Sequence, residues 1–266
     1  MESLLETPKV ICRDYVEIKK YKIYQANIVV RPAGLIQRVF RFLVGLSVLI
    51  ILLLFAILLV FRWVPVPTSA FIYHQNALAR NAPKIHDPAE YQWASWDEIS
   101  PYLALAVIAA EDQRFPTHWG VDTIELKKAL AEKRSSKGML RGASTITQQL
   151  AKNLFLWNGR SYSRKILEAG LALAIEIAWP KKRILEVYLN VAQFGDAIFG
   201  AKESSRILFD KDPINLTKEE AAILAAVLPR PAISDVHSPR PRLLRKQQWI
   251  LKQMSQLGGL RYLKKL

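Results

Sequence analysis

The sequence predicts an all-α domain that follows one membrane-spanning helix. Residues 42–61 read FLVGLSVLIILLLFAILLVF, twenty residues without a charge, Asn, Gln or Pro. At helical rise they span about 30 Å, the thickness of the hydrocarbon core of a bilayer. Beyond residue 100, capped apolar segments of helical length recur, and beyond residue 62 no segment alternates as a strand would. We therefore expect three parts: 1–41, a transmembrane helix at 42–61, and one domain at 62–266.

The flanks of the apolar segment predict its orientation. Within twenty residues, four basic residues precede it and two follow it: Lys22, Arg31, Arg38 and Arg41, then Arg62 and Arg80. Basic residues favour the cytoplasmic side, so we expect a cytoplasmic N-terminus and a periplasmic domain on the cell inner (cytoplasmic) membrane. A cleavable signal peptide fits poorly, because the apolar segment is long and begins about 40 residues into the chain.

Boundary signals predict the helices of the domain in order. Ser100-Pro101 is an N-cap followed by a first helical residue, and Thr217 with Glu220 forms a capping box. Ser144 is the expected cap of a second helix. The predicted helices cover 101–113, 144–155, 164–179, 181–191, 221–228 and 242–257. Residues 62–88 are expected to be a proline-punctuated connection, and the polar, glycine-containing segment 132–144 a mobile loop.

Charge and cysteine content narrow the class of function. The chain carries a formal net charge of +15, and residues 62–266 hold 30 Lys and Arg against 19 Asp and Glu. Outside the cytoplasm, such a basic domain is expected to meet anionic lipid or an anionic lipid-linked substrate, and no nucleic acid. A single cysteine, Cys12, excludes a disulfide scaffold and a cysteine-based metal site. The four histidines lack metal-ligand spacing.

Glu111 is the first candidate for chemistry. It follows a uniformly apolar helix and shares a helical face with Val107 and Ile108, so it should point toward the interior or a cleft. A half-buried carboxylate suits general acid or base catalysis. The alternative is an ordinary ion pair at a helix end, for instance with Arg114.

Two further groups of polar residues stand on predicted helices. Gln149, Lys152 and Asn153 form one polar face, suited to sugar hydroxyls and a phosphate. Arg164 and Glu168 are spaced i, i+4 at the start of an apolar helix. Taken singly, each group is more readily explained as a solvated helix face or a surface pair. The remaining candidates favour internal hydrogen bonding: Glu186, Asn190 and His118.

In order along the chain, these segments resemble the peptidoglycan glycosyltransferase family. They are EDQRFPTHWG at 111–120, GASTITQQLAKN at 142–153, RKILE at 164–168 and KKRILEVYLN at 181–190. The resemblance covers about residues 100–230 and implies a lysozyme-like fold and polymerisation of lipid II. With one apolar helix and no transpeptidase domain, the chain is most similar to the monofunctional branch. It departs from the pattern at 201–212, where Leu208 replaces a tyrosine and Ser204 and Ser205 replace alanines, and we expect stability to change there before mechanism.

The resemblance implies a role for each matched residue. Glu111 is the general base for an inverting transfer, and Glu168 orients Arg164 or the substrate, or holds a divalent cation (Mg or Mn) that bridges the diphosphate. The leaving diphosphate is neutralised by Lys152 and Arg164, with Lys165 and Arg141 second. Sugar and phosphate contacts come from Ser144, Thr145, Gln149 and Asn153. Structural roles fall to Asp112, Phe115, His118, Glu186 and Asn190.

The resemblance also implies partners, and two rival functions stay open. The expected partners are lipid II, the growing undecaprenyl-diphosphate-linked glycan, the membrane, and cell-wall synthesis or division proteins, with no tightly bound cofactor. One rival is a lysozyme-like lytic enzyme, in which a lone glutamate cleaves glycan strands. Such an enzyme has no diphosphate to neutralise and no need for Lys152, Arg164 and Lys165. The other rival is an inactive membrane-anchored scaffold.

Overall fold

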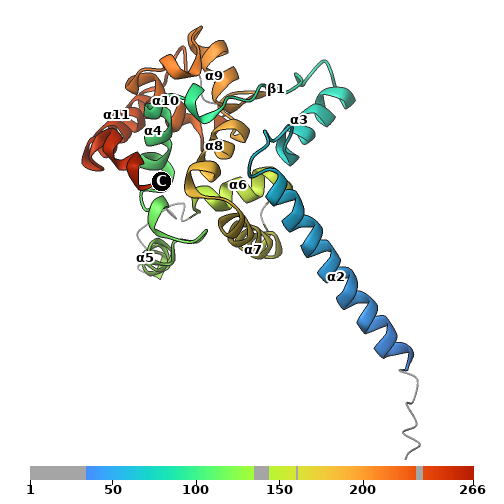
Figure 1. Ribbon diagram of the computed structural model, residues 1–266. Coiled ribbons are helices and arrows are strands. Elements are labelled where there is room, and N and C mark those ends of the chain that lie inside the picture. Colours follow the sequence, from blue (N-terminus) through green and yellow to red (C-terminus); the bar gives the residue numbers. More distant parts are fainter. Residues whose placement is uncertain (1–33, 135–143, 160, 232–235) are drawn as a thin grey trace, which may run out of the picture. The chain divides into compact units, whose positions relative to one another are not determined.

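The computed structural model describes residues 34–134, 144–159, 161–231 and 236–266 (Figure 1). Contacts divide the chain into an N-terminal unit, Met1–Leu52, and a larger unit, Leu53–Leu266. The larger unit is built almost entirely from helices, which confirms the predicted all-α class.

Helix α2 (Leu35–Val60) is, within the described residues, the one helix long and apolar enough to cross a membrane. It begins seven residues before the predicted span, because LIQRVFR contains no helix breaker. The end of this helix belongs to the larger unit, where Leu58 is fully buried. Trp179 Nε1 donates to the carbonyl of Leu58 at 2.6 Å, and Arg183 donates to the carbonyl of Phe61 at 2.8 Å. These bonds satisfy carbonyls that a helix end leaves without partners.

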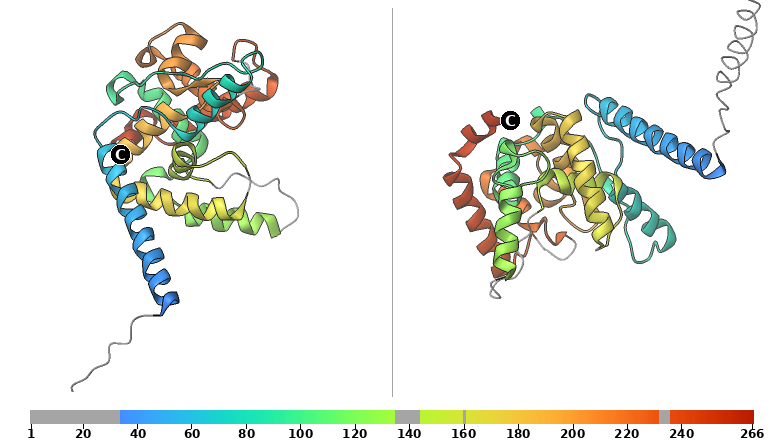
Figure 2. Two further views of the ribbon diagram at one scale, coloured as in Figure 1. Left: turned by 90° about the vertical axis from the view of Figure 1, so that its right-hand side faces the viewer. Right: turned by 90° about the horizontal axis from the view of Figure 1, so that it is seen from below.

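Two groups of helices form the core of the larger unit. In the first, α4 (Pro101–Glu111) packs against α10 (Lys218–Val227) and α11 (Pro241–Gln256). In the second, α6 (Ile146–Phe155) packs against α7 (Tyr162–Ala178) and α8 (Lys181–Val191). The views in Figure 2 show these helices from two further sides. Seven consecutive residues of α4, Leu103–Ala109, are buried, as an apolar helix without a polar face requires.

The caps agree with the sequence at two helices and differ at one. Ser100 accepts from the amide of Tyr102 at the start of α4, and Thr217 forms its capping box with Glu220 at the start of α10. At α6, however, the cap is Thr145, which forms a capping box with Gln148. The prediction that Ser144 caps this helix is wrong, because the next residue supplies both the hydroxyl and the box spacing.

Several short elements escape the sequence analysis. Helix α3 (Ala70–Asn81) lies inside the segment expected to be a connection, because the prolines flank it and do not interrupt it. Helices α5 (Thr123–Arg134) and α9 (Gly200–Phe209) were not predicted, and α5 is too polar to show an apolar face. Strands β1 (Glu90–Tyr91) and β2 (Ile198–Phe199) pair in parallel but are too short to show alternation. The 3₁₀ turns are η1 (Trp96–Glu98), η2 (Phe115–Thr117), η3 (Pro213–Asn215) and η5 (Gly259–Lys265).

The atypical segment at 201–212 packs within the core. Ser204 and Ser205 are buried on α9, and the Ser204 hydroxyl donates to the carbonyl of Ala201. Leu208 is half-buried and packs against the core. The Ser205 hydroxyl is buried without a hydrogen-bond partner among the described residues. A buried unpaired hydroxyl costs stability, so the contacts are in keeping with an effect on folding.

Gly200 begins α9 where a side chain cannot fit. Its φ is +82°, and an added Cβ would lie 2.5 Å from the carbonyl oxygen of Asn190. We expect Gly200→Ala to lower the free energy of unfolding by about 1–3 kcal/mol, from the left-handed backbone and the clash. Thermal unfolding measures this. Gly170→Ala is the control, because Gly170 is helical with open space around it, and it should be neutral or stabilising. An equally stable Gly200→Ala variant would contradict the account of this turn.

Candidate active site

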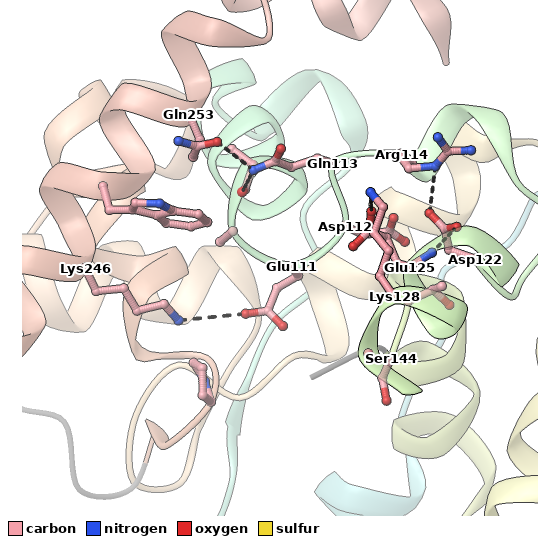
Figure 3. Close-up of a pocket in the computed structure, with 16 residues that line it drawn as sticks. Glu111, Asp112, Gln113, Arg114, Asp122, Glu125, Lys128, Ser144, Lys246 and Gln253 are labelled. Atoms are coloured by element: carbon pink, nitrogen blue, oxygen red, sulfur yellow. Dashed lines mark hydrogen bonds and ion pairs between the residues drawn. The ribbon is translucent and has the colours of Figure 1, made fainter. Parts of the chain in front are cut away.

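A pocket of about 860 Å³ opens beside the C-terminal end of α4 (Figure 3). Glu111 and Asp112, the last residue of α4 and its C-cap, line it together with Lys246 and Gln253 from α11. Ser144, which precedes α6, lines it as well. The pocket therefore gathers polar side chains from segments far apart in the sequence, which is the usual make-up of a binding site.

Glu111 is held from two other helices. Its side chain is 15% exposed, and its Oε2 accepts from Gln149 Nε2 at 2.7 Å. The Gln149 carbonyl oxygen accepts in turn from the hydroxyl of Tyr188 at 2.8 Å. On the other side, Lys246 Nζ lies 4.0 Å from Glu111 Oε1 (Figure 3). The sequence analysis placed Glu111 toward a cleft, and the structure does the same.

Lys246 was not among the predicted site residues. Burial lowers the pKa of Lys246, with the charge of Arg242 acting in the same direction and that of Glu111 opposing it. No sequence signal marks this residue, because α11 carries basic residues all along its length and only the fold brings this one to Glu111.

Asp112 joins the end of α4 to the start of α6. Its carboxylate accepts from His118 Nε2 at 2.9 Å and from the backbone amide of Ile146 at 3.0 Å. Phe115 is fully buried, and its ring meets the His118 ring edge-on. These contacts are those of the structural role expected for the three side chains.

Asp122 lies beside this junction. Its carboxylate accepts from the amides of Ile124 and Glu125 and pairs with Arg114 at 2.9 Å, so Arg114 is not the partner of Glu111. Asp112, His118 and Asp122 offer ligand atoms within 4.8 Å of one another. Because the carboxylate oxygens of Asp112 and Asp122 already accept hydrogen bonds from protein groups, we interpret the cluster as a structural junction.

Glu168 organises a second cluster of charges. It is almost fully buried on α7 and accepts from Arg164 Nη1 at 2.9 Å and from the ammonium of Lys165. Lys165 also donates to the hydroxyl of Ser144 at 2.9 Å, so Ser144 contacts a cation of α7. Arg164 Nε is buried and has no hydrogen-bond partner within the described residues. One of the two cations of this cluster thus presents a buried donor without a partner in the described part of the chain, which suits an incoming anion.

Lys152, on α6, is near both Glu111 and the cluster of charges around Glu168. Its ammonium lies 5.0 Å from the centre of the Phe71 ring, a cation–π contact with α3. Burial lowers the pKa of Lys152, the charge of Glu168 opposes this, and those of Arg164 and Lys165 reinforce it. Glu111 also raises it, so the ammonium is within electrostatic range of both carboxylates.

The remaining predicted residues take defined places. Thr145 is a buried cap, Asn153 is half-buried on α6, and Arg141 lies outside the described residues, as do residues 135–143 of the predicted mobile loop. The first residues of that loop, up to Arg134, are helical in α5.

Glu186 and Asn190 make the internal hydrogen bonds that their spacing on α8 favours. Glu186 accepts from the amide of Trp96 and from Arg183, both at 2.8 Å. Asn190 is fully buried, accepts from the amide of Ala94 at 2.7 Å and donates to its carbonyl at 2.8 Å.

Glu176 is a buried carboxylate that the sequence analysis missed. It accepts from the amide of Gly120 at 3.1 Å, from Thr147 at 2.6 Å and from Lys181 at 2.6 Å. It therefore ties three segments to α7. The sequence does not indicate this role, because a glutamate on this helix could equally be exposed to solvent. Its hydrogen-bond partners show that its carboxylate is buried.

An all-α domain with a partly buried glutamate at a pocket, near a cluster of cations, is suited to acid–base chemistry on a substrate that carries an anionic group. A family model described as Transglycosylase matches residues 78–255. The biosynthetic peptidoglycan transglycosylases of Escherichia coli (strain K12) and of Escherichia coli O139:H28 are each 50% identical to the chain over 219 residues. The matched region covers 82% of this chain and 90% of each relative. The chain belongs to the transglycosylase family, as the motifs at 111–190 indicated.

Proposed function

We propose that this peptidoglycan transglycosylase polymerises lipid II, with Glu111 as the general base. Peptidoglycan transglycosylase activity follows from the family model and the relatives. The observation that supports the roles proposed here is the pairing of a hydrogen-bonded, half-buried Glu111 with a separate cationic cluster, in which the buried Arg164 Nε has no partner among the described residues. The first suits deprotonation of a hydroxyl, and the second suits a departing diphosphate.

The reaction forms one bond and breaks one. The 4-hydroxyl oxygen of the acceptor sugar attacks the anomeric carbon of the donor while its proton passes to Glu111. The bond from that carbon to the diphosphate oxygen breaks, and undecaprenyl diphosphate leaves with the electron pair. A single displacement of this kind inverts the anomeric centre and gives a β-1,4 linkage.

Three cations compensate the charge that grows on the diphosphate. Arg164 offers an Nε that has no partner in the described part of the chain, and Lys165 and Lys152 add charge beside it. In a half-buried site such interactions are stronger than in water, because less solvent screens them. Sugar contacts are assigned to Ser144, Gln149 and Asn153, with Arg141 as a further phosphate contact.

A divalent cation held by Glu168 does not fit the contacts of this side chain. Each oxygen of Glu168 already accepts a hydrogen bond from a cation, one from Arg164 and one from Lys165, so Mg or Mn would have to compete with both. Two adjacent cations also oppose a third positive charge at that point. We assign Glu168 to the orientation of these two residues, and no step of the reaction is routed through a metal at this carboxylate.

The cationic cluster favours a transferase over a glycan-cleaving enzyme. Cleavage of an uncharged glycan needs one proton-transferring carboxylate and no anion site, whereas transfer from lipid II needs both. The test is to give purified full-length protein lipid II in one reaction and preformed glycan in another. We expect polymer from lipid II and intact glycan in the second. Cleavage of the glycan would identify a lytic enzyme, and no reaction in either would identify a scaffold.

Membrane topology gives an independent expectation. The apolar helix Leu35–Val60 and its basic upstream flank support a periplasmic domain, on the side where the lipid-linked donor would be used. A reporter fused after residue 266 should be active only if it works outside the cytoplasm. A paired fusion to a reporter that fluoresces only in the cytoplasm is the control, and fluorescence from that fusion would contradict the assignment.

A further inference from the structure

A line of hydrogen bonds runs from the core to the pocket and ends on Glu111. The Tyr188 hydroxyl donates to Gln149 Oε1 at 2.8 Å, and Gln149 Nε2 donates to Glu111 Oε2 at 2.7 Å. The three residues stand on α8, α6 and α4, so each link crosses between helices. Tyr188 is 1% exposed and is held by the core, which makes it the fixed end of the line.

The hydrogen-bonding capacities of Glu111 and Tyr188 fix the direction of both hydrogen bonds. An ionised carboxylate accepts hydrogen bonds and cannot donate, so Gln149 must turn its NH₂ group toward Glu111. The amide oxygen then faces Tyr188, whose hydroxyl must be the donor. Burial raises the pKa of Tyr188 well above its usual value of 10, and the charges of Glu111 and Asp112 act in the same direction. The phenol therefore keeps its proton throughout the pH range in which the enzyme works.

The two oxygens of Glu111 consequently differ. Oε2 is tied to Gln149, whereas Oε1 accepts no hydrogen bond within the described part of the chain and lies 4.0 Å from Lys246 Nζ. Glu111 lines the pocket, so the unoccupied oxygen is the one available to an incoming hydroxyl.

We propose that Tyr188 is a positioning residue for the transfer reaction: through Gln149 it holds Glu111 Oε2 and leaves Oε1 to take the acceptor proton. The inference rests on the proposed function of Glu111 as base. Without the phenol, the amide oxygen of Gln149 loses its anchor in the core, so among the described residues this side chain is held only by Glu111 itself and can move together with the carboxylate. The base then lacks a fixed geometry, and its catalytic contribution falls.

Tyr188→Phe is the direct test, because it removes one oxygen and keeps the ring that fills the core. In full-length enzyme assayed with lipid II, we expect kcat to fall about 2- to 10-fold, the range of one hydrogen bond between neutral groups, while KM stays near the wild-type value. Tyr91→Phe is the matched control, since the Tyr91 hydroxyl also donates to another element, at the carbonyl of Val66. The control should keep the wild-type kcat.

A double-mutant cycle separates positioning from a general structural effect. Gln149→Leu removes the middle of the line, so adding Tyr188→Phe to that variant should lower kcat no further. An equal fall in both backgrounds, or a wild-type kcat for Tyr188→Phe alone, would overturn the inference. Either result is compatible with an inactive Glu111→Gln variant, so the proposed function would stand. A wild-type enzyme that makes no polymer would overturn both proposals together.

Discussion

Replacing Glu111 with glutamine is expected to abolish the polymerisation of lipid II. Glutamine keeps the shape of the side chain and one oxygen, but it cannot take the proton of the acceptor hydroxyl. General base catalysis contributes about 10²–10⁴-fold, so the rate should fall by at least that range. The amide of Gln149 now donates to Glu111 at 2.7 Å, and in the variant it can donate to the new carbonyl oxygen, so the fold should be preserved.

The measurement is the initial rate of polymer formation, with lipid II binding and thermal unfolding followed in parallel. Glu125→Gln is the matched control, because Glu125 lines the same pocket and its carboxylate is exposed and paired with Lys128 at 2.7 Å. That variant should polymerise as wild type does. A Glu111→Gln enzyme that retains more than about a tenth of the wild-type rate, well outside the range for a general base, would remove Glu111 from the mechanism.

Removing Lys152, or Arg164 of the Glu168 cluster, is expected to slow turnover about 10- to 100-fold, the equivalent of one charge-assisted contact of roughly 1.5–3 kcal/mol. The variants are Lys152→Ala and Arg164→Ala. Arg164→Lys should also be impaired, because an ammonium lacks the planar fork of a guanidinium and cannot reproduce the Nε donor, which has no partner among the described residues. Steady-state rates with lipid II measure all three. Lys128→Ala, which removes an exposed lysine of the pocket, is the control and should change little.

Lys152 also predicts a dependence on pH. Burial lowers the pKa of Lys152, so this ammonium loses its proton at a lower pH than an exposed lysine does. Its charge is present below that pKa and is lost as pH rises through it, so turnover should decline on the alkaline side. Lys152→Arg retains the charge and should extend activity to higher pH. Wild-type rates in Arg164→Ala, or an unchanged alkaline decline in Lys152→Arg, would contradict these assignments.

The sequence predicts those helices whose boundaries and burial depend on neighbouring residues alone. Helix α8 begins at Lys181 because Pro180 precedes it, and the capping box of Thr217 needs only four neighbouring residues. The apolar stretch that becomes α4 is long enough to predict a buried helix whatever packs around it. Helix α3 could not be predicted in this way, because its apolar residues lack a clear helical period and its packing partner is α6, a distant segment.

The residues of the candidate site likewise fall into two groups, those that the sequence predicts and those that it does not. Glu111, Gln149 and Arg164 belong to motifs whose residue types already suggest proton transfer and anion binding. Lys246 and Glu176 do not, because the partners that reveal their places come from distant segments: Glu111 for the first, and Gly120 and Thr147 for the second. Tyr188 lay within a recognised motif, but its link to Glu111 through Gln149 appears only when three helices are assembled.

The anomeric configuration of the newly formed linkage tests the central claim most directly. A base that deprotonates the acceptor for one displacement at the donor carbon inverts that centre. Nuclear magnetic resonance of the polymer made from lipid II by the purified enzyme should therefore show β-1,4 linkages only. New linkages that keep the α configuration of the donor would require two displacements, and they would contradict a mechanism in which Glu111 acts as the base.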